Sequence, residues 1–212
     1  MLLFASLGLA APRVYGQPQP GAPVDLRCEY LTNPLGVDVV RPRFSWVSPD
    51  NGRGEAQSAY QVLVAATADE LARNHGDVWD SGKAASDNSI QVAYGGLPVV
   101  SGQTYYWKVR VWDEEGRPSP YSQPARFEMG LLSRGEWKGQ WIGGGNELRK
   151  EFQLPATALR ARVYVTALGY YELRINGRRV GESVLDPAFT TYPERVLYRT
   201  YDVTADLKPG AN

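Results

Sequence analysis

The chain has 212 residues, a length that suits one or two domains. Its composition, 43% hydrophobic and 22% charged residues, excludes a wholly disordered protein. The 23 Lys and Arg residues balance 23 Asp and Glu residues, so no basic field favours nucleic acid or anionic lipid. Aromatic residues make up 11% of the chain, and 22 Gly and 15 Pro accompany them, which is typical of an all-β protein.

The first sixteen residues have the pattern of a secretory signal peptide. Leu2 to Ala11 is an apolar run of suitable length, and Val14-Tyr15-Gly16 supplies the cleavage-site positions. The run is too short to span a bilayer. Residues 17–23 are a proline-rich linker. We therefore expect a secreted or periplasmic protein with no membrane contact once the signal is removed.

Thiol and imidazole chemistry have little support in this sequence. Cys28 is the single cysteine, so an intrachain disulfide is excluded, and it is predicted to be a small buried apolar residue. His75 is the single histidine and lies in a polar run, which predicts a solvated loop position. No cofactor is indicated.

Residues 24–135 alternate apolar and polar residues in short segments separated by turns. The segments predicted as strands are Phe44–Trp46, Tyr60–Ala66, Ser89–Tyr94, Tyr105–Asp113 and Ala125–Met129. Thr67-Ala68-Asp69-Glu70 fits a capping box and predicts a brief helix. Asp113, Glu114 and Glu115 occupy a predicted hairpin turn, where solvated acids are normal. This spacing indicates a small antiparallel sandwich.

Residues 136–212 repeat the strand pattern after a glycine-rich linker. The predicted strands are Leu148–Leu154, Arg160–Ala167, Tyr170–Ile175, Arg178–Leu185 and Val196–Val203. Asn176-Gly177 predicts a type I′ hairpin turn, which needs positive φ at both positions. About 70 residues are few for a complete sandwich. We therefore expect this domain to be incomplete and the chain to be a fragment.

Several short sequence motifs, in a fixed order along the chain, connect the second domain with a known family. They are Gly169-Tyr170-Tyr171-Glu172, Ile175-Asn176-Gly177, Val180-Gly181, Asp186-Pro187, Thr190-Thr191-Tyr192 and Tyr198 to Thr204. This block resembles the N-terminal domain of bacterial α-L-rhamnosidases, glycoside hydrolase family 78.

The first domain is similar to the module that opens many of these enzymes. The matching motifs are Tyr60-Gln61-Val62, Trp79-Asp80-Ser81-Gly82, Tyr105 to Asp113 and Phe127-Glu128-Met129-Gly130. The resemblance implies an all-β chain of two antiparallel β-sandwich domains in tandem. The first would be immunoglobulin/fibronectin III-like, and the second jelly-roll-like and truncated.

Catalytic residues are not assigned in this chain. Glycoside hydrolysis normally needs two carboxyl groups that flank the scissile bond. The family's acid and base lie in an (α/α)₆ barrel after the β domains, and no long amphipathic helix pattern occurs here. The resemblance thus implies an inactive, non-catalytic part of the enzyme.

A loop between two predicted strands carries the candidate sugar-binding residues Asp186, Phe189, Tyr192 and Arg195. Aromatic rings that stack on a sugar, with polar groups for its hydroxyls, are typical of such sites. Alternatively, the two aromatics pack the loop onto the sandwich while Asp186 and Arg195 pin it. No metal ligands are assigned; calcium is possible by family resemblance, but no acid spacing identifies a site.

Two hypotheses from different classes remain open. The first is the N-terminal, substrate-recognition part of a secreted α-L-rhamnosidase, with a rhamnose-containing glycoside or polysaccharide as partner. The second is a free-standing carbohydrate-binding or adhesion protein without hydrolase activity. Reading the DNA downstream of Asn212 for an in-frame helical barrel would separate them.

Overall fold

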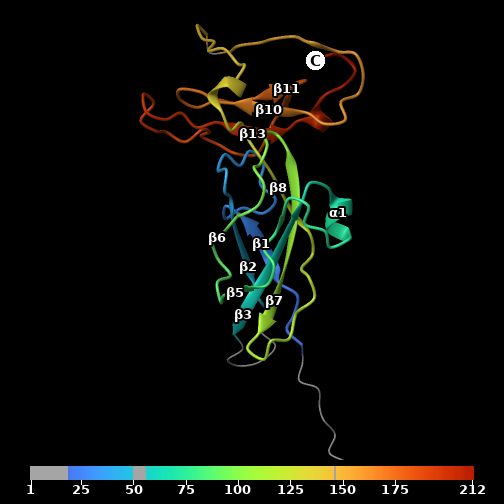
Figure 1. Cartoon of the computed structure of the whole chain (residues 1–212). Coiled ribbons are helices and arrows are strands. Elements are labelled where there is room, and N and C mark those ends of the chain that lie inside the picture. Colours follow the sequence, from blue (N-terminus) through green and yellow to red (C-terminus); the bar gives the residue numbers. More distant parts are fainter. Residues whose placement is uncertain (1–18, 50–55, 146) are drawn as a thin grey trace, which may run out of the picture.

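The structure is a computed structural model that describes residues 19–49, 56–145 and 147–212. The predicted signal peptide, residues 1–16, lies outside the described residues, as does the start of the linker. Figure 1 shows an upright first domain with the second domain, coloured yellow to red, lying across its upper end. No helix in the described part of the chain is long and apolar enough to cross a membrane.

The first domain consists of two antiparallel sheets that face each other. One sheet has the strand order β1-β2-β6, and the other has the order β4-β3-β7-β8 with β5 also paired to β3. The strands are β1 (Val24–Cys28), β2 (Arg43–Val47), β3 (Gln57–Ala65), β4 (Trp79–Asp80), β5 (Ala84–Ala85), β6 (Val92–Ala93), β7 (Thr104–Asp113) and β8 (Ala125–Glu128). This arrangement confirms the predicted all-β, immunoglobulin-like first domain.

Aromatic side chains from both sheets fill the space between them. The rings of Phe44 and Trp107 lie 4.4 Å apart, and Phe127 meets Phe44 edge-on at 5.6 Å. All three side chains are completely buried. Burying a side chain of this kind stabilises the fold by about 2–3 kcal/mol. Cys28 is buried in the same core, as predicted, and burial raises the pKa of its thiol.

A short helix covers part of the outer face of the second sheet. Helix α1 (Ala68–Ala72) begins after Thr67, whose hydroxyl accepts a hydrogen bond from the backbone N–H of Glu70 at 3.2 Å. This is half of the predicted capping box, because the Glu70 carboxylate contacts Arg73 and His75 and not the backbone N–H of Thr67. Lys108 lies under this helix, where its Nζ donates to the carbonyl oxygen of Leu71 at 2.6 Å. The burial lowers the pKa of Lys108. Lys108 alternates with the core residues of β7 and so lies on the outer face of the sheet, which α1 covers at this point.

The hairpin turn after β7 also differs from the prediction. Glu114 and Glu115 are exposed, whereas Asp113 is buried. Its carboxylate accepts hydrogen bonds from the backbone N–H of Arg117 at 2.8 Å and from the Arg117 guanidinium at 2.7 Å. Asp113 therefore closes the turn and is not a solvated acid. His75 is exposed, as predicted, and its Nδ1 lies 2.7 Å from Oε2 of Glu70.

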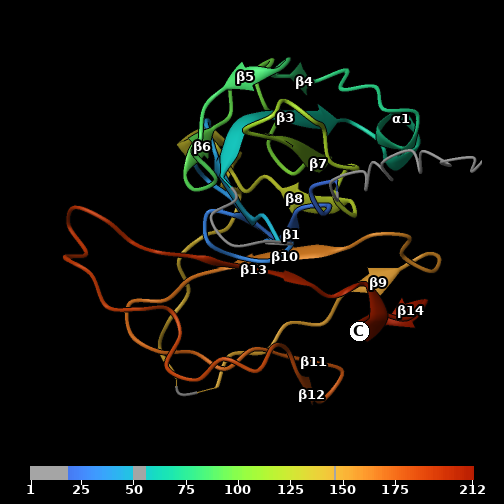
Figure 2. The same cartoon turned by 90° about the horizontal axis from the view of Figure 1, so that it is seen from below.

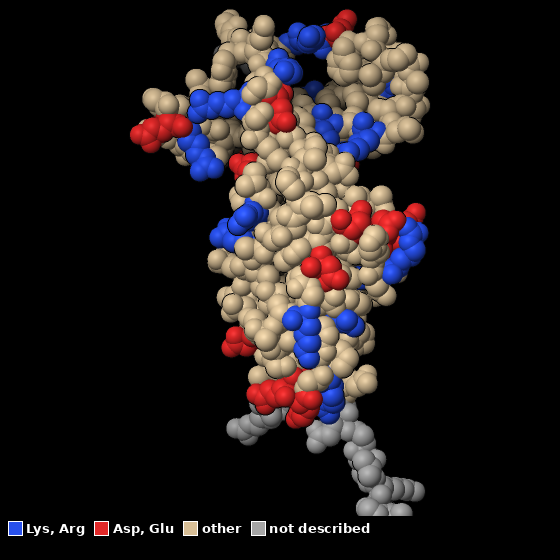
Figure 3. Space-filling model, in the orientation of Figure 1, with Lys and Arg blue, Asp and Glu red and all other residues tan. Residues whose placement is uncertain are grey.

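The second domain contains three separate antiparallel strand pairs, β9-β14, β10-β13 and β11-β12. These strands are β9 (Gln153–Leu154), β10 (Arg162–Val165), β11 (Arg174–Ile175), β12 (Arg178–Arg179), β13 (Arg199–Asp202) and β14 (Gly210–Ala211), and two 3-10 turns occur at Arg134–Glu136 and Thr204–Asp206. Figure 2 shows β10 and β13 next to the first domain and β11 and β12 on the far side. On the face drawn in Figure 3, basic and acidic side chains are interspersed over both domains.

These strands are shorter than predicted. A strand lasts only where a partner lies opposite it, and the paired stretches here are two to four residues long. Burial is also sparse: among the described residues of this domain, only Val180, Asp186, Pro187 and Val203 are buried. The antiparallel pairing agrees with the prediction, but packing contributes much less here than in the first domain.

The predicted hairpin turn provides a test of backbone geometry. Asn176 has φ 51° and Gly177 has φ 80°, so both central positions are left-handed as the type I′ prediction required. A Cβ atom on Gly177 would meet no other atom within 4 Å. The Gly177→Val substitution therefore strains only the backbone, and it should lower the free energy of unfolding by about 1–2 kcal/mol.

Urea unfolding, followed by amide signals of β11 and β12, measures this change. Arg178→Ala is the matched control, because Arg178 is exposed on the same hairpin. Coincident unfolding curves for the two variants would contradict the turn assignment.

Candidate functional site

The predicted sugar-binding loop joins β12 to β13 and combines one buried acid with exposed aromatic rings. Asp186 is buried, and its Oδ1 accepts hydrogen bonds from Nε and Nη2 of Arg199 at 3.0 and 2.9 Å. Its Oδ2 accepts a hydrogen bond from the hydroxyl of Tyr201 at 3.2 Å. Burial raises the pKa of Asp186, but the Arg199 contacts outweigh it and hold the pKa below its usual value. Asp186 thus anchors the loop to β13.

Three aromatic rings lie together on the outside of this loop. Phe189 meets Tyr170 edge-on with 4.8 Å between ring centroids, and it lies 6.0 Å from Tyr192. Phe189 is 60% exposed and Tyr170 is 50% exposed. The hydroxyl oxygen of Tyr192 is buried and has no hydrogen-bond partner among the described residues. We call Tyr170, Phe189 and Tyr192 the aromatic platform.

Sequence reasoning missed Tyr170, because it treated that residue as part of a strand. The sequence held a signal, because the predicted alternation places adjacent residues on opposite faces, although in the structure Tyr170 and Tyr171 lie before β11. Tyr171 points inward, where its hydroxyl lies 3.1 Å from that of Tyr201, so its neighbour Tyr170 is the exposed member of the pair.

Arg195 lies on the exposed turn that follows the platform. Its backbone N–H donates to the carbonyl oxygen of Thr191 at 2.9 Å. Within the residues that the structure describes, its guanidinium makes no hydrogen bond or ion pair. The structure therefore leaves this cation available, whereas Asp186 is engaged. Contact of Asp186, Phe189, Tyr192 or Arg195 with a sugar stays a prediction.

No metal centre emerges from the described residues. Residues 19–49, 56–145 and 147–212 contain no group of three or more His, Cys, Asp or Glu side chains placed to hold a metal ion. Glu172 of the family motif pairs with Arg174 at 2.6 Å on the exposed hairpin. Asp202 accepts a hydrogen bond from the backbone N–H of Thr204 at 3.0 Å, which fixes the turn that follows β13.

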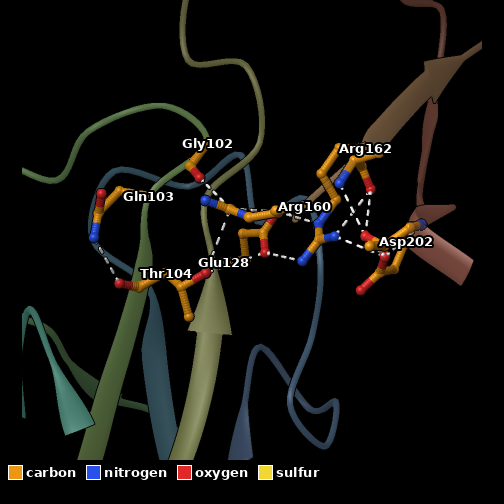
Figure 4. Close-up of polar contacts among 9 residues, drawn as sticks. Gly102, Gln103, Thr104, Glu128, Arg160, Arg162 and Asp202 are labelled. Atoms are coloured by element: carbon orange, nitrogen blue, oxygen red, sulfur yellow. Dashed lines mark hydrogen bonds and ion pairs between the residues drawn. The ribbon is translucent and has the colours of Figure 1, made fainter. Parts of the chain in front are cut away.

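The loop is carried on a domain whose attachment depends on a buried acid, Glu128, at the end of β8 (Figure 4). Only 2% of its side chain is exposed. Arg162 of β10 donates from Nε to Oε1 at 2.7 Å and from Nη2 to Oε2 at 2.9 Å. Arg160 adds an ion pair at 3.0 Å, and the hydroxyl of Thr104 donates at 3.1 Å. Two guanidinium groups of the second domain thus share one carboxylate of the first.

These contacts also determine the charge of Glu128. Burial raises the pKa of its carboxyl, but hydrogen bonds from Arg162 and Arg160 and their positive charges outweigh burial and lower the pKa. The carboxylate therefore stays ionised at neutral pH. A buried ion pair of this kind is costly to break, because the remaining charge loses its partner.

Tyr198 of the second domain makes a further contact with the first domain at the junction. Its hydroxyl accepts a hydrogen bond from the backbone N–H of Leu131 at 2.9 Å, and its ring lies 5.8 Å from that of Trp137. A Cβ atom on Gly130 would overlap the Tyr198 hydroxyl. Gly130 is thus required for the close approach of the two domains.

Replacing Glu128 by Gln should loosen the junction in a pH-dependent way. The folded pKa is depressed, so the ionised carboxylate contributes its full stability above about pH 5 and loses it as the pH falls below the unfolded value of about 4.3. We expect Glu128→Gln to lower the free energy of unfolding by about 2–3 kcal/mol at pH 7. The difference from wild type should shrink as the pH falls to about 3.

Urea unfolding at pH 7 and pH 3 measures both effects. Glu114→Gln is the control, because this glutamate is exposed and should change stability by less than about 0.5 kcal/mol. A Glu128→Gln variant as stable as wild type at pH 7 would refute the role of this ion pair.

Comparison with known proteins gives matches on both sides of the junction. Residues 23–133 match the family model of the Rha78A-like N-terminal immunoglobulin domain, and residues 156–212 match that of the α-L-rhamnosidase N-terminal domain. An α-L-rhamnosidase of Formosa agariphila is 36% identical over 85% of this chain and 22% of its own length. The chain thus spans about a fifth of the length of the curated relatives that it matches.

Solved structures agree with this match. The structure of an α-L-rhamnosidase from Dictyoglumus thermophilum superposes with a TM-score of 0.85 and 39% identity, covering 90% of this chain and 24% of that one. A Streptomyces avermitilis α-L-rhamnosidase complexed with L-rhamnose gives a TM-score of 0.55 and 29% identity, covering 90% and 21% of the two chains. The chain therefore belongs to the α-L-rhamnosidase family, whose N-terminal immunoglobulin domain and N-terminal domain it carries.

Proposed function

We propose that this chain is the non-catalytic, substrate-recognition part of a secreted α-L-rhamnosidase that hydrolyses terminal α-L-rhamnose from glycosides. The aromatic platform is the observation that carries this proposal. Phe189 is 60% exposed and Tyr170 is 50% exposed, although both side chains are large and aromatic. Exposed aromatic groups next to polar residues are typical of binding sites.

The chemistry of rhamnose suits this surface. The sugar has an apolar C–H face and a methyl group, which can stack on the Phe189 ring, while its hydroxyls need polar partners. Arg195 is exposed on the adjoining turn and its side chain has no partner among the described residues, so it can donate to a hydroxyl. Asp186 fixes the position of the loop through its hydrogen bonds to Arg199 and Tyr201 of β13.

The state of the carboxyl groups supports a non-catalytic role. A glycosidase needs one carboxyl with a raised pKa to act as the general acid. The buried acids described above have lowered pKa values instead, because Arg117, Arg199 and the pair Arg160 and Arg162 stabilise their ionised forms. A proton donor for a leaving group is therefore missing from these positions. The proposal of export rests on the sequence of residues 1–16, with the apolar run Leu2 to Ala11 and the cleavage-site positions Val14-Tyr15-Gly16.

Binding of L-rhamnose to the full chain tests the proposal. Titration followed by amide chemical shifts should give a Kd in the ~mM range, because a shallow site buries little surface. Phe189→Ala should weaken binding about five- to tenfold, which corresponds to a loss of roughly 1–1.4 kcal/mol. Trp141→Ala is the matched control, since Trp141 is a similarly exposed aromatic residue outside the loop. Equal weakening in both variants would argue against a site at the platform.

Hydrolysis by this chain is the second test. We expect no release of nitrophenol from an aryl α-L-rhamnoside, because enzymes gain about 10⁶-fold or more in rate from groups that position acid, base and water. The assay uses the purified chain beside an active rhamnosidase as positive control. Turnover that is lost in Asp186→Ala or Glu172→Ala would refute the non-catalytic role.

A further inference from the structure

A cleft of about 490 Å³ lies at the junction of the two domains, away from the aromatic platform. The first domain contributes the outer face of its sheet, through Thr104, Tyr106 and Arg126, and the connection between β3 and α1. The second domain contributes Arg160, Arg162 and Asp202. Ligand sites in proteins commonly have volumes of about 300–1,000 Å³ and often lie between domains.

The charges around this cleft do not balance. Three guanidinium groups, those of Arg126, Arg160 and Arg162, line it. Two carboxylates lie among them: Glu128 is shared by Arg160 and Arg162, and Asp202 pairs with Arg162 at 2.9 Å. Figure 4 shows that Arg160 and Arg162 both point toward Glu128. Arg126 makes no ion pair with any described acid.

Arg126 is the cation of the cleft that has no acidic partner among the described residues. It lies on β8 opposite Tyr106 of β7, on the same face of the sheet as Glu128 two residues later. Its side chain is exposed and makes no hydrogen bond or ion pair within the part of the chain that the structure describes. A guanidinium of this kind binds a carboxylate through two parallel hydrogen bonds.

The other lining groups suit a polyhydroxylated ring. Within the described residues, the amide oxygen of Gln103 and the hydroxyl of Tyr106 make no internal hydrogen bond, although both residues line the cleft. The Thr67 hydroxyl accepts from Glu70 and keeps its own proton to donate. Donors and acceptors are thus arranged around one uncompensated positive charge.

We propose that this cleft binds an anionic sugar unit, a hexuronate, with its carboxylate on Arg126 and its hydroxyls on Gln103, Tyr106 and Thr67. The site is separate from the aromatic platform and goes beyond the function proposed there. A chain with both sites would recognise a saccharide that combines a neutral deoxy sugar with an acidic one.

Titration of the full chain with methyl β-D-glucuronide and with methyl β-D-glucoside tests this site, because the two sugars differ only in the carboxylate. We expect amide shifts at Gln103, Tyr106 and Arg126, a ~mM Kd for the glucuronide, and binding of the glucoside at least tenfold weaker. Arg126→Gln should abolish this preference. High salt should weaken glucuronide binding, since the cleft is open to solvent.

Arg178→Gln is the matched control, because Arg178 is an exposed arginine on β12, away from the cleft. Phe189→Ala should leave glucuronide binding unchanged, so failure of the platform and failure of the cleft are distinguishable. Equal binding of the two sugars, or an Arg126→Gln variant that keeps the preference, would overturn the proposal. Competition by inorganic sulfate as strong as by glucuronide would also overturn it, because the cleft would then be a general anion site.

Discussion

The ion pair between Glu128 and the two arginines of the second domain governs how the rest of the structure is arranged. A carboxylate that is 2% exposed costs free energy to bury, and Arg160 and Arg162 offset that cost only when the second domain lies across the end of β8. The contact therefore specifies an orientation as well as adding stability. The bidentate geometry of Arg162 tolerates little rotation of one domain against the other.

Neighbouring contacts reinforce the same orientation by shape. Gly130 allows the Tyr198 hydroxyl to approach the backbone of the first domain, and Gly36 allows the same for Thr200. These positions tolerate no side chain without a shift of one domain. Polar and steric constraints therefore act on the same junction. Both proposed binding surfaces depend on this junction: it positions the second domain, which carries the aromatic platform, and it forms the walls of the cleft.

Sequence reasoning predicted local features well and features that depend on distant contacts poorly. The alternation in Tyr105 to Val111 predicted the core strand, and Asn176-Gly177 predicted the positive φ values of its turn, because both signals come from adjacent residues. The alternation in β7 does not reveal that Lys108 is covered, because the cover comes from α1, whose residue Leu71 is 37 positions away in the chain. Glu128 was recognised as part of the family motif Phe127-Glu128-Met129-Gly130. Its arginine partners lie in the other domain, however, and no local sequence pattern reveals that ion pair.

The buried thiol of Cys28 has a consequence for following this molecule in solution. A thiol reagent needs the thiolate, and burial both shields the sulfur and raises the pKa of the group. Labelling of Cys28 therefore proceeds only in molecules whose first sandwich has opened. Because the chain has a single cysteine, the labelling rate reports the opening of that sandwich alone and is silent on the second domain. The chain thus carries a natural probe that can separate the opening of one domain from that of the other.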